Sequence, residues 1–102
     1  MDADDPEIDA VIDELFAVIE DRRERLPEDS YTASLLTHEK GEDAVLEKVG
    51  EEATEFVLAA KNDRPDRTTS EAADLIYHLL VALVAEDITA ADLRAELADR
   101  RS

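Results

Sequence analysis

Four acidic side chains are spaced along the chain so that they could bind a metal ion. Carboxylates three or four residues apart lie on one side of an α-helix, and two pairs have that spacing: Glu52 with Glu55, and Glu71 with Asp74. Mg²⁺ prefers oxygen ligands of this kind, and when bound it also holds phosphate groups and lowers the pKa of water. Spacing alone has little weight, because 28 of the 102 residues are Asp or Glu. The position of these acids relative to apolar residues is more informative.

Glu52 stands in the middle of an apolar stripe on a helix predicted from about Glu42 to Lys61. At about 100° per residue, this stripe contains Val45, Val49, Ala53, Phe56 and Ala60. The edge of the stripe is flanked by Glu55 and Lys48, with Glu51 further round the helix. Burying an unpaired carboxylate costs several kcal/mol, so Glu52 must take up a proton or find a cation.

The next helix is predicted from about Thr68 or Ser70 to Glu86 and carries a similar anomaly. One stripe of its N-terminal half contains Glu71, Asp74 and His78. A short turn joins the two helices, so we expect antiparallel packing in which Glu52 and Glu55 face Glu71 and Asp74. Four acids at an apolar contact repel one another, and a hard divalent cation would remove that conflict.

Ordinary structural roles are open for the same residues. Glu71 could complete a capping box with Thr68, and Lys48 could form a surface pair with Glu52. Glu51 is expected to be solvated or paired, with Lys48 or with another helix, unless it closes the metal site. Packing within the core is the ordinary role for His78 and Tyr77.

The rest of the chain is also predicted to be helical. Apolar residues at helical spacing predict a first helix from Pro6 to about Arg25. A short helical turn is predicted over 30–36, and a last helix after Thr89, whose spacing to Asp92 resembles a capping box. Gly50 lies inside a long helix, where Gly costs about 1 kcal/mol relative to Ala, which favours close packing or the approach of a ligand there.

These elements predict an all-α fold, a helical bundle of four to five helices with two long antiparallel central helices. Residues 75–85 are apolar nearly all round their helix, and a chain this small cannot cover every side of it. We therefore expect dimerisation to complete the bundle. Residues 1–5 are expected to form a flexible acidic N-terminus, and residues 6–102 a single domain.

The charge of the chain indicates which partners it can bind and in which salt conditions it is stable. With 11 Lys and Arg against 28 Asp and Glu, the formal charge is -17, which disfavours binding to nucleic acid or to an anionic membrane surface. The acid-rich, Lys-poor composition suits a halophilic cytosol, where salt screens self-repulsion. No secretory signal precedes the first helix, so we expect a cytoplasmic protein. Without Cys, neither disulfides nor thiolate chemistry is available.

Four segments of the sequence closely resemble the phosphoribosyl-ATP pyrophosphohydrolase family. They are Ser-Tyr-Thr-Ala-Ser-Leu-Leu at 30–36, Lys-Val-Gly-Glu-Glu-Ala-Thr-Glu at 48–55, Ala-Ala-Lys-Asn at 59–62 and Glu-Ala-Ala-Asp-Leu-Ile-Tyr-His-Leu-Leu at 71–80. The acidic pattern alone is shared with the wider all-α nucleoside-triphosphate pyrophosphatases, which include MazG-like enzymes. The first segment and the Lys-Val-Gly sequence narrow the resemblance to the histidine-pathway member.

The resemblance implies a helical homodimer that uses Mg²⁺ to hydrolyse phosphoribosyl-ATP to phosphoribosyl-AMP and pyrophosphate, the second step of histidine biosynthesis. It implies metal ligands among Glu51, Glu52, Glu55, Glu71 and Asp74, with the last four favoured. Glu51 or Glu55 could position or deprotonate the attacking water. The candidates for contacts with phosphate or ribose are Lys48, Lys61, Asn62, Arg22 and Arg23.

Two other functions are compatible with the same residues. The first is a housekeeping pyrophosphatase of the MazG-like type, which would act on free nucleoside or deoxynucleoside triphosphates with the same metal site. The second is a non-enzymatic helical interaction module, in which the acids only keep the protein soluble.

Overall fold

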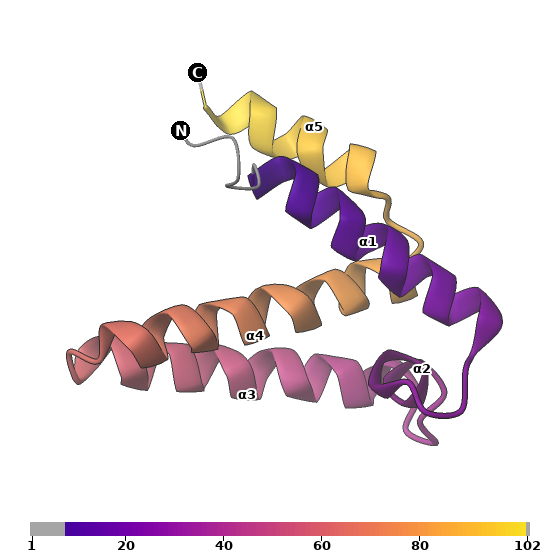
Figure 1. Ribbon diagram of the computed structural model, residues 1–102, viewed down its shortest axis with the longest axis horizontal. Helices are drawn as coiled ribbons and strands as arrows, with labels where there is room; N and C mark the ends of the chain where they lie inside the picture. The colour runs from indigo at the N-terminus through magenta and orange to yellow at the C-terminus, as the bar shows by residue number, and fades with distance from the viewer. Residues whose placement is uncertain (1–7, 102) are drawn as a thin grey trace.

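The computed structural model describes residues 8–101 and contains five helices in that range, joined by short connections (Figure 1). Their bounds are α1 Ile8–Arg25, α2 Tyr31–Leu36, α3 Glu42–Lys61, α4 Pro65–Ala85 and α5 Ala90–Arg100. Residues 8–101 contain no strand, so the predicted all-α class is confirmed. The predictions for residues 1–5 and for a helix start at Pro6 lie outside the described residues.

The two long helices α3 and α4 run antiparallel and lie side by side along most of their length (Figure 1). The bounds of α3 are those predicted from its apolar periodicity, whereas α4 begins earlier than Thr68 or Ser70, at Pro65. Proline suits the first position of a helix because its φ is already helical and its missing N–H would have no partner there. Asp66 in the same turn interacts favourably with the helix dipole.

One local prediction about these helices is wrong, and one of two alternatives offered for another is contradicted. Thr68 lies inside α4, where its hydroxyl donates to the carbonyl of Arg64 at 2.9 Å, so it does not form a capping box with Glu71. Gly50 lies on an exposed face of α3, and a Cβ atom added to it would meet no atom within 4 Å. Its absent side chain is therefore not needed for close packing within this chain.

The short helix α2 lies between α1 and the N-terminal end of α3 (Figure 1). Its predicted position is confirmed, and the Ser30 hydroxyl caps it by accepting a hydrogen bond from the Ala33 amide at 3.1 Å. The chain leaves α1 through Leu26 at a φ of 49° and enters α3 through Gly41 at a φ of 66°. Glycine adopts that left-handed region without steric cost, which suits the tight entry into α3.

The core lies where α1 and α2 cross the hairpin of α3 and α4. Side chains from all four helices contribute to it, and the largest that are fully buried are Phe16, Ile19, Val45, Leu80 and Val81. On α3 the apolar stripe continues to Ala59, which is buried, and not to Ala60, which is exposed. One face of the hairpin consequently has little cover from the rest of the described chain.

Large apolar side chains are exposed on both helices of the hairpin. Those of α3 and α4 are Leu46, Val57, Leu58, Ile76 and Leu79. By length and composition α4 would also be apolar enough to cross a membrane. It is, however, the central helix of the bundle, and it carries Asp74 and His78, so the test for a membrane span is weak evidence here.

The last helix, α5, runs beside α1 (Figure 1). Its predicted capping box is confirmed: the Thr89 hydroxyl accepts from the Asp92 amide at 3.1 Å, and the Asp92 carboxylate accepts from the Thr89 amide at 3.0 Å. Leu93 packs against the core, and the Arg94 guanidinium donates to the Asp13 carboxylate of α1. No side chain of α5 is fully buried, so this helix is attached mainly by its first two turns.

Candidate metal centre

Three of the predicted metal ligands meet at the contact between α3 and α4. Glu52 of α3 and Glu71 and Asp74 of α4 each offer one carboxylate oxygen, and these oxygens all lie within 4.8 Å of one another. We call these three residues the acid cluster. The Glu52 and Glu71 side chains are each only 14% exposed, whereas Asp74 lies at the exposed edge. The predicted convergence of acids across the helix contact is therefore present for three of the four residues.

The electrostatics of the acid cluster show that its negative charges are in conflict. The pKa of Glu71 is raised above its ordinary value, first by burial and then by the nearby charges of Glu55, Asp74 and Glu52. Arg67 opposes this effect but does not cancel it. A carboxyl group whose charged form is destabilised by other carboxylates is a site where a cation would bind favourably.

Glu55 and Glu51 lie outside the acid cluster. Glu55 is exposed and close enough to raise the pKa of Glu71, so it faces the same region from the next turn of α3. Glu51 is well exposed, and its carboxylate accepts a hydrogen bond from Lys48 Nζ at 3.3 Å. The predicted pairing of Glu51 with Lys48 is thus confirmed.

Two cations lie beside the acid cluster, and one of them, Lys48, is among the residues predicted from the sequence. Lys48 Nζ is 3.9 Å from a Glu52 oxygen, and an Arg67 Nη is 3.7 Å from a Glu71 oxygen. The sequence does not predict Arg67, because the helix expected from about Thr68 or Ser70 excludes it, whereas α4 includes residue 67 and gives Arg67 and Glu71 helical i,i+4 spacing. Both contacts are longer than a hydrogen bond, so neither cation neutralises its carboxylate closely.

His78 and two tyrosines form a hydrogen-bonded group directly beneath Asp74. The carbonyl of Asp74 can only accept, so His78 Nδ1 carries a proton and donates to it at 2.8 Å. His78 Nε2 is hydrogen-bonded to the Tyr31 hydroxyl at 2.9 Å. His78 is only 5% exposed, and both nitrogens have partners, which agrees with the core role and not with a metal ligand. Tyr77 packs beside it, its hydroxyl hydrogen-bonded to Thr32.

The other predicted substrate contacts lie away from the acid cluster. Lys61 and Asn62 are at the C-terminal end of α3, where the Asn62 amide donates to the Leu58 carbonyl at 2.8 Å. Arg22 pairs with Asp21 at 2.6 Å near the opposite end of the bundle. Arg23, also at that end, donates to the Val84 carbonyl at 2.5 Å and to Asp87 at 2.7 Å. Val84 is ten residues from Asp74, or roughly 15 Å along α4.

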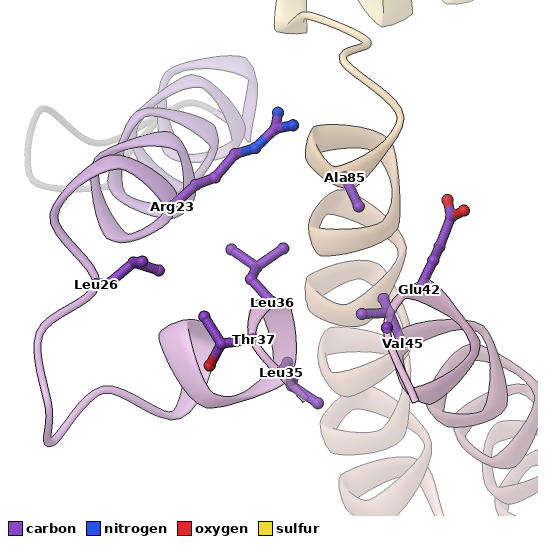
Figure 2. Close-up of a pocket in the computed structure, with 9 residues that line it drawn as sticks. Arg23, Leu26, Leu35, Leu36, Thr37, Glu42, Val45 and Ala85 are labelled. Carbon is purple, nitrogen blue, oxygen red and sulfur yellow. The ribbon is translucent and has the colours of Figure 1, made fainter. Parts of the chain in front are cut away.

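A cavity of about 300 Å³ opens at the end of the bundle near Arg23 (Figure 2). It is bounded by α1, α2, α3 and α4, and the apolar residues of its wall are Leu26, Leu35, Leu36, Val45 and Ala85. Arg23 and Glu42 flank the last turn of α4 at its rim (Figure 2). None of its lining residues belongs to the acid cluster, so this cavity is not the predicted metal centre.

Comparison with known proteins confirms the resemblance read from the sequence. The family model described as phosphoribosyl-ATP pyrophosphohydrolase matches residues 12–101. A phosphoribosyl-ATP pyrophosphatase of Haloarcula marismortui is 67% identical, over 89% of this chain and 93% of the relative. Proteins of the same name from Natronomonas pharaonis and Methanoculleus marisnigri are 61% and 56% identical, over 99% and 89% of this chain and 100% and 94% of the relatives.

Proposed function

We propose that this chain, which belongs to the phosphoribosyl-ATP pyrophosphohydrolase family, hydrolyses phosphoribosyl-ATP to phosphoribosyl-AMP and pyrophosphate. This reaction is the second step of histidine biosynthesis. The observation that carries the proposal is the family match over 12–101 together with the acid cluster, which lies within that range. We further propose that residues 6–102 act as a single domain in the cytoplasm.

We propose Mg²⁺ as the cofactor, held by the acid cluster. The donors are all carboxylate oxygens, which suit a hard divalent ion and not a softer one. Mg–O bonds of about 2.1 Å place ligand oxygens about 3 to 4 Å apart, so small rotations of the three side chains would bring them into range. When bound, Mg²⁺ would shield the polyphosphate and lower the pKa of a water molecule.

The remaining side chains around the acid cluster supply the other parts of a hydrolysis. Glu55 is exposed and faces the same region, so it can orient the attacking water and accept its proton while the bond between the α- and β-phosphates breaks. Glu51 is the second candidate for this role, although Lys48 already binds its carboxylate. Lys48 and Arg67 can contact phosphate oxygens, because neither is fully engaged with the cluster.

We propose a homodimer formed through the uncovered face of the hairpin. Val57, Leu58, Ile76 and Leu79 are exposed on the two helices of the hairpin, and a second copy would bury apolar surface of this kind. Leu79→Glu should shift the protein towards monomer in sedimentation velocity. Leu97→Glu on α5, at a side chain that is at least as exposed, is the matched control and should leave the mass unchanged. A monomeric wild type, or equal effects of both substitutions, would contradict the proposal.

The direct test of the activity is pyrophosphate release from phosphoribosyl-ATP in molar KCl, with and without Mg²⁺. We expect release with Mg²⁺ and a loss of nearly all activity after chelation. A panel of nucleoside and deoxynucleoside triphosphates is the control for the housekeeping alternative. Comparable rates on that panel would remove the histidine-pathway assignment.

The high acid content fits the haloarchaeal relatives and has its own test. The charge of -17 creates self-repulsion that concentrated salt screens, over about 3 Å at 1 M. We expect the thermal unfolding midpoint to rise between 0.1 M and 2 M KCl, by more than it rises for a relative of balanced charge. A midpoint that does not change with salt would contradict adaptation to a halophilic cytosol.

A further inference from the structure

Tyr31 is oriented in an unusual way for a surface tyrosine. A tyrosine commonly buries its ring and leaves the hydroxyl in water. Tyr31 is 50% exposed, yet its hydroxyl is bonded to the buried Nε2 of His78 at 2.9 Å. The hydroxyl is therefore bonded to a buried side chain, while half of the surface of the residue remains accessible.

The Tyr31 ring is held in place by two neighbouring rings. Tyr77 stacks on it with a centroid distance of 6.2 Å and an interplanar angle of 26°. His78 meets it edge-on, at 5.8 Å and 81°. Tyr77 is fixed in turn by its hydrogen bond to Thr32. A flat surface that is already rigid loses little conformational entropy when a ligand packs against it.

Tyr31 also lies in the same neighbourhood as the acid cluster. The charge of Lys48 acts on the Tyr31 hydroxyl, and so do the charges of Glu52 and Glu51, although burial is the main reason that its pKa is raised. Lys48 is the cation that lies 3.9 Å from Glu52. His78, which binds the Tyr31 hydroxyl, donates its other nitrogen to the backbone of Asp74. An exposed ring, a cation and a carboxylate cluster thus occupy adjacent positions.

The chain has few other places for a flat aromatic ligand. It contains two Tyr, two Phe and no Trp. Phe16 is buried in the core, and Phe56 and Tyr77 are each only partly exposed, so Tyr31 has the most accessible ring among them. A nucleotide substrate carries a planar base at one end and a charged phosphate chain at the other. The Tyr31 ring could contact the base, while Lys48 and the acid cluster lie where they could bind the phosphates.

We propose that the exposed face of the Tyr31 ring is the surface on which the base of the substrate stacks, with Lys48 beside it contacting the phosphates. This inference rests on the proposed function and adds a specificity-determining residue to it. The contact is remote from the bond that breaks, so it should be made equally in the ground state and in the transition state. Loss of such a contact raises KM and leaves kcat nearly unchanged.

Three variants test the role of the ring. Tyr31→Leu removes it, and we expect KM for phosphoribosyl-ATP to rise about tenfold or more, as for the loss of one base–aromatic stack. Tyr31→Phe keeps the ring and removes only the hydrogen bond to His78, so its KM should stay much closer to that of the wild type. Leu97→Ala, at an exposed apolar residue of α5, controls for a general surface effect.

A binding measurement that needs no turnover separates this inference from the proposed function. With AMP and Mg²⁺ added to the wild type, we expect nuclear Overhauser effects between the Tyr31 ring protons and the base protons. Binding of AMP without those effects, or equal KM values for Tyr31→Leu and the wild type, would overturn the stacking role. A weaker dimer with unchanged KM would overturn it as well, because the ring would then be part of the subunit interface. No pyrophosphate release by the wild type would refute the proposed function, while the AMP spectrum would still decide the stacking.

Discussion

The acidic residues at the two ends of the bundle differ in how closely a cation approaches them. Near the C-terminal ends of α1 and α4, arginines pair closely with acids: Arg22 with Asp21 at 2.6 Å, Arg23 with Asp87 at 2.7 Å and Arg25 with Asp21 at 2.9 Å. At the contact of α3 and α4, three carboxylates converge, and the nearest cations stay 3.7 and 3.9 Å away. The more buried acids thus have the weaker partners.

This difference in pairing indicates which acidic residues have a structural role and which have a functional one. Exposed ion pairs add at most about 1 kcal/mol each, so the arginine-rich end gains modestly from its pairs. A half-buried carboxylate without a close cation destabilises the fold that contains it. Only 11 Lys and Arg are available for 28 acids, and close pairing is found away from the acid cluster. A chain that keeps an unfavourable cluster of this kind is expected to use it for binding a cation.

The largest effect should come from Glu52→Gln, which removes one carboxylate from the acid cluster without changing its size. We expect kcat/KM for phosphoribosyl-ATP to fall more than about 100-fold, because even residues that only orient metal ligands contribute about 10- to 100-fold. The matched control is Asp87→Asn at the paired end, which should leave pyrophosphate release within about twofold, since nothing there contacts substrate in the proposed function. Unchanged turnover in Glu52→Gln would contradict the role of Glu52 as a metal ligand.

Glu71→Gln tests whether the carboxylates of the cluster repel one another. The pKa of Glu71 is raised above its ordinary value of 4.5, so the folded chain holds this proton more tightly than the unfolded chain does. The resulting stability is fully present below that value and is lost as the pH rises through the folded pKa. Without divalent ions, the variant should therefore unfold at a higher temperature than the wild type at pH 7, and the difference should shrink below pH 4.5.

The same pair of proteins gives a test of metal binding. Mg²⁺ at 100 times its Kd should stabilise the wild type by about 2.7 kcal/mol. The gain should be much smaller in Glu71→Gln, since one of the three ligands is gone. Differential scanning fluorimetry with and without Mg²⁺ measures both midpoints. Equal gains in the two proteins would show that the ion binds elsewhere.

Arg23→Met tests the end of the bundle where arginines pair closely with acids. Arg23 donates to the Val84 carbonyl at the end of α4 and to the Asp87 carboxylate, so we expect a loss of about 1 kcal/mol from the free energy of unfolding. Turnover should be unaffected. Arg25→Met, at a more exposed arginine with one ion pair, should cost less. A large rise in KM in Arg23→Met would restore Arg23 as a substrate contact, as the sequence analysis proposed.

Local signals in the sequence were sufficient for most of the helices. Apolar periodicity predicted both ends of α3, Glu42 and Lys61, and Ser30 marked the start of α2. The stripe on α3 also showed that Glu52 is directed towards α4, which the convergence with Glu71 and Asp74 confirms. These features depend on residues within a few turns of one another, where helical geometry alone determines the arrangement.

Features that depend on tertiary contacts could not be predicted in the same way. The start of α4 at Pro65 was missed because a proline and a polar stretch are compatible with either a turn or a first helical turn, and that error hid Arg67. The hydrogen bond of Tyr31 to His78 joins residues 47 positions apart, and no local pattern indicates it. Similarly, the hydrogen bond from Arg23 to the Val84 carbonyl of α4 depends on how α1 crosses the hairpin.

A local effect, confined to one helix, is expected at the capping box of α5, near the end of the molecule where arginines pair with acids. Thr89→Ala removes the hydroxyl that accepts from the Asp92 amide, and we expect α5 to lose about 1 kcal/mol of local stability. Faster hydrogen exchange of the α5 amides would report it. The bonds from Thr89 also lower the pKa of Asp92, so their stabilising effect is present above the ordinary pKa of 3.8 and is lost as the pH falls through the folded pKa.

Thr68→Ala is the matched control for that experiment, because the same substitution removes a hydroxyl in the interior of α4. The Thr68 hydroxyl donates to the Arg64 carbonyl, which is a bond within the helix and not a cap. We expect little change in exchange or even a slight slowing, since Ala has the higher helix propensity. A loss as large as that in Thr89→Ala would mean that Thr68 caps α4 after all and that Glu71 is occupied as its capping partner. In that case the acid cluster would lose one of its three ligands to a structural role.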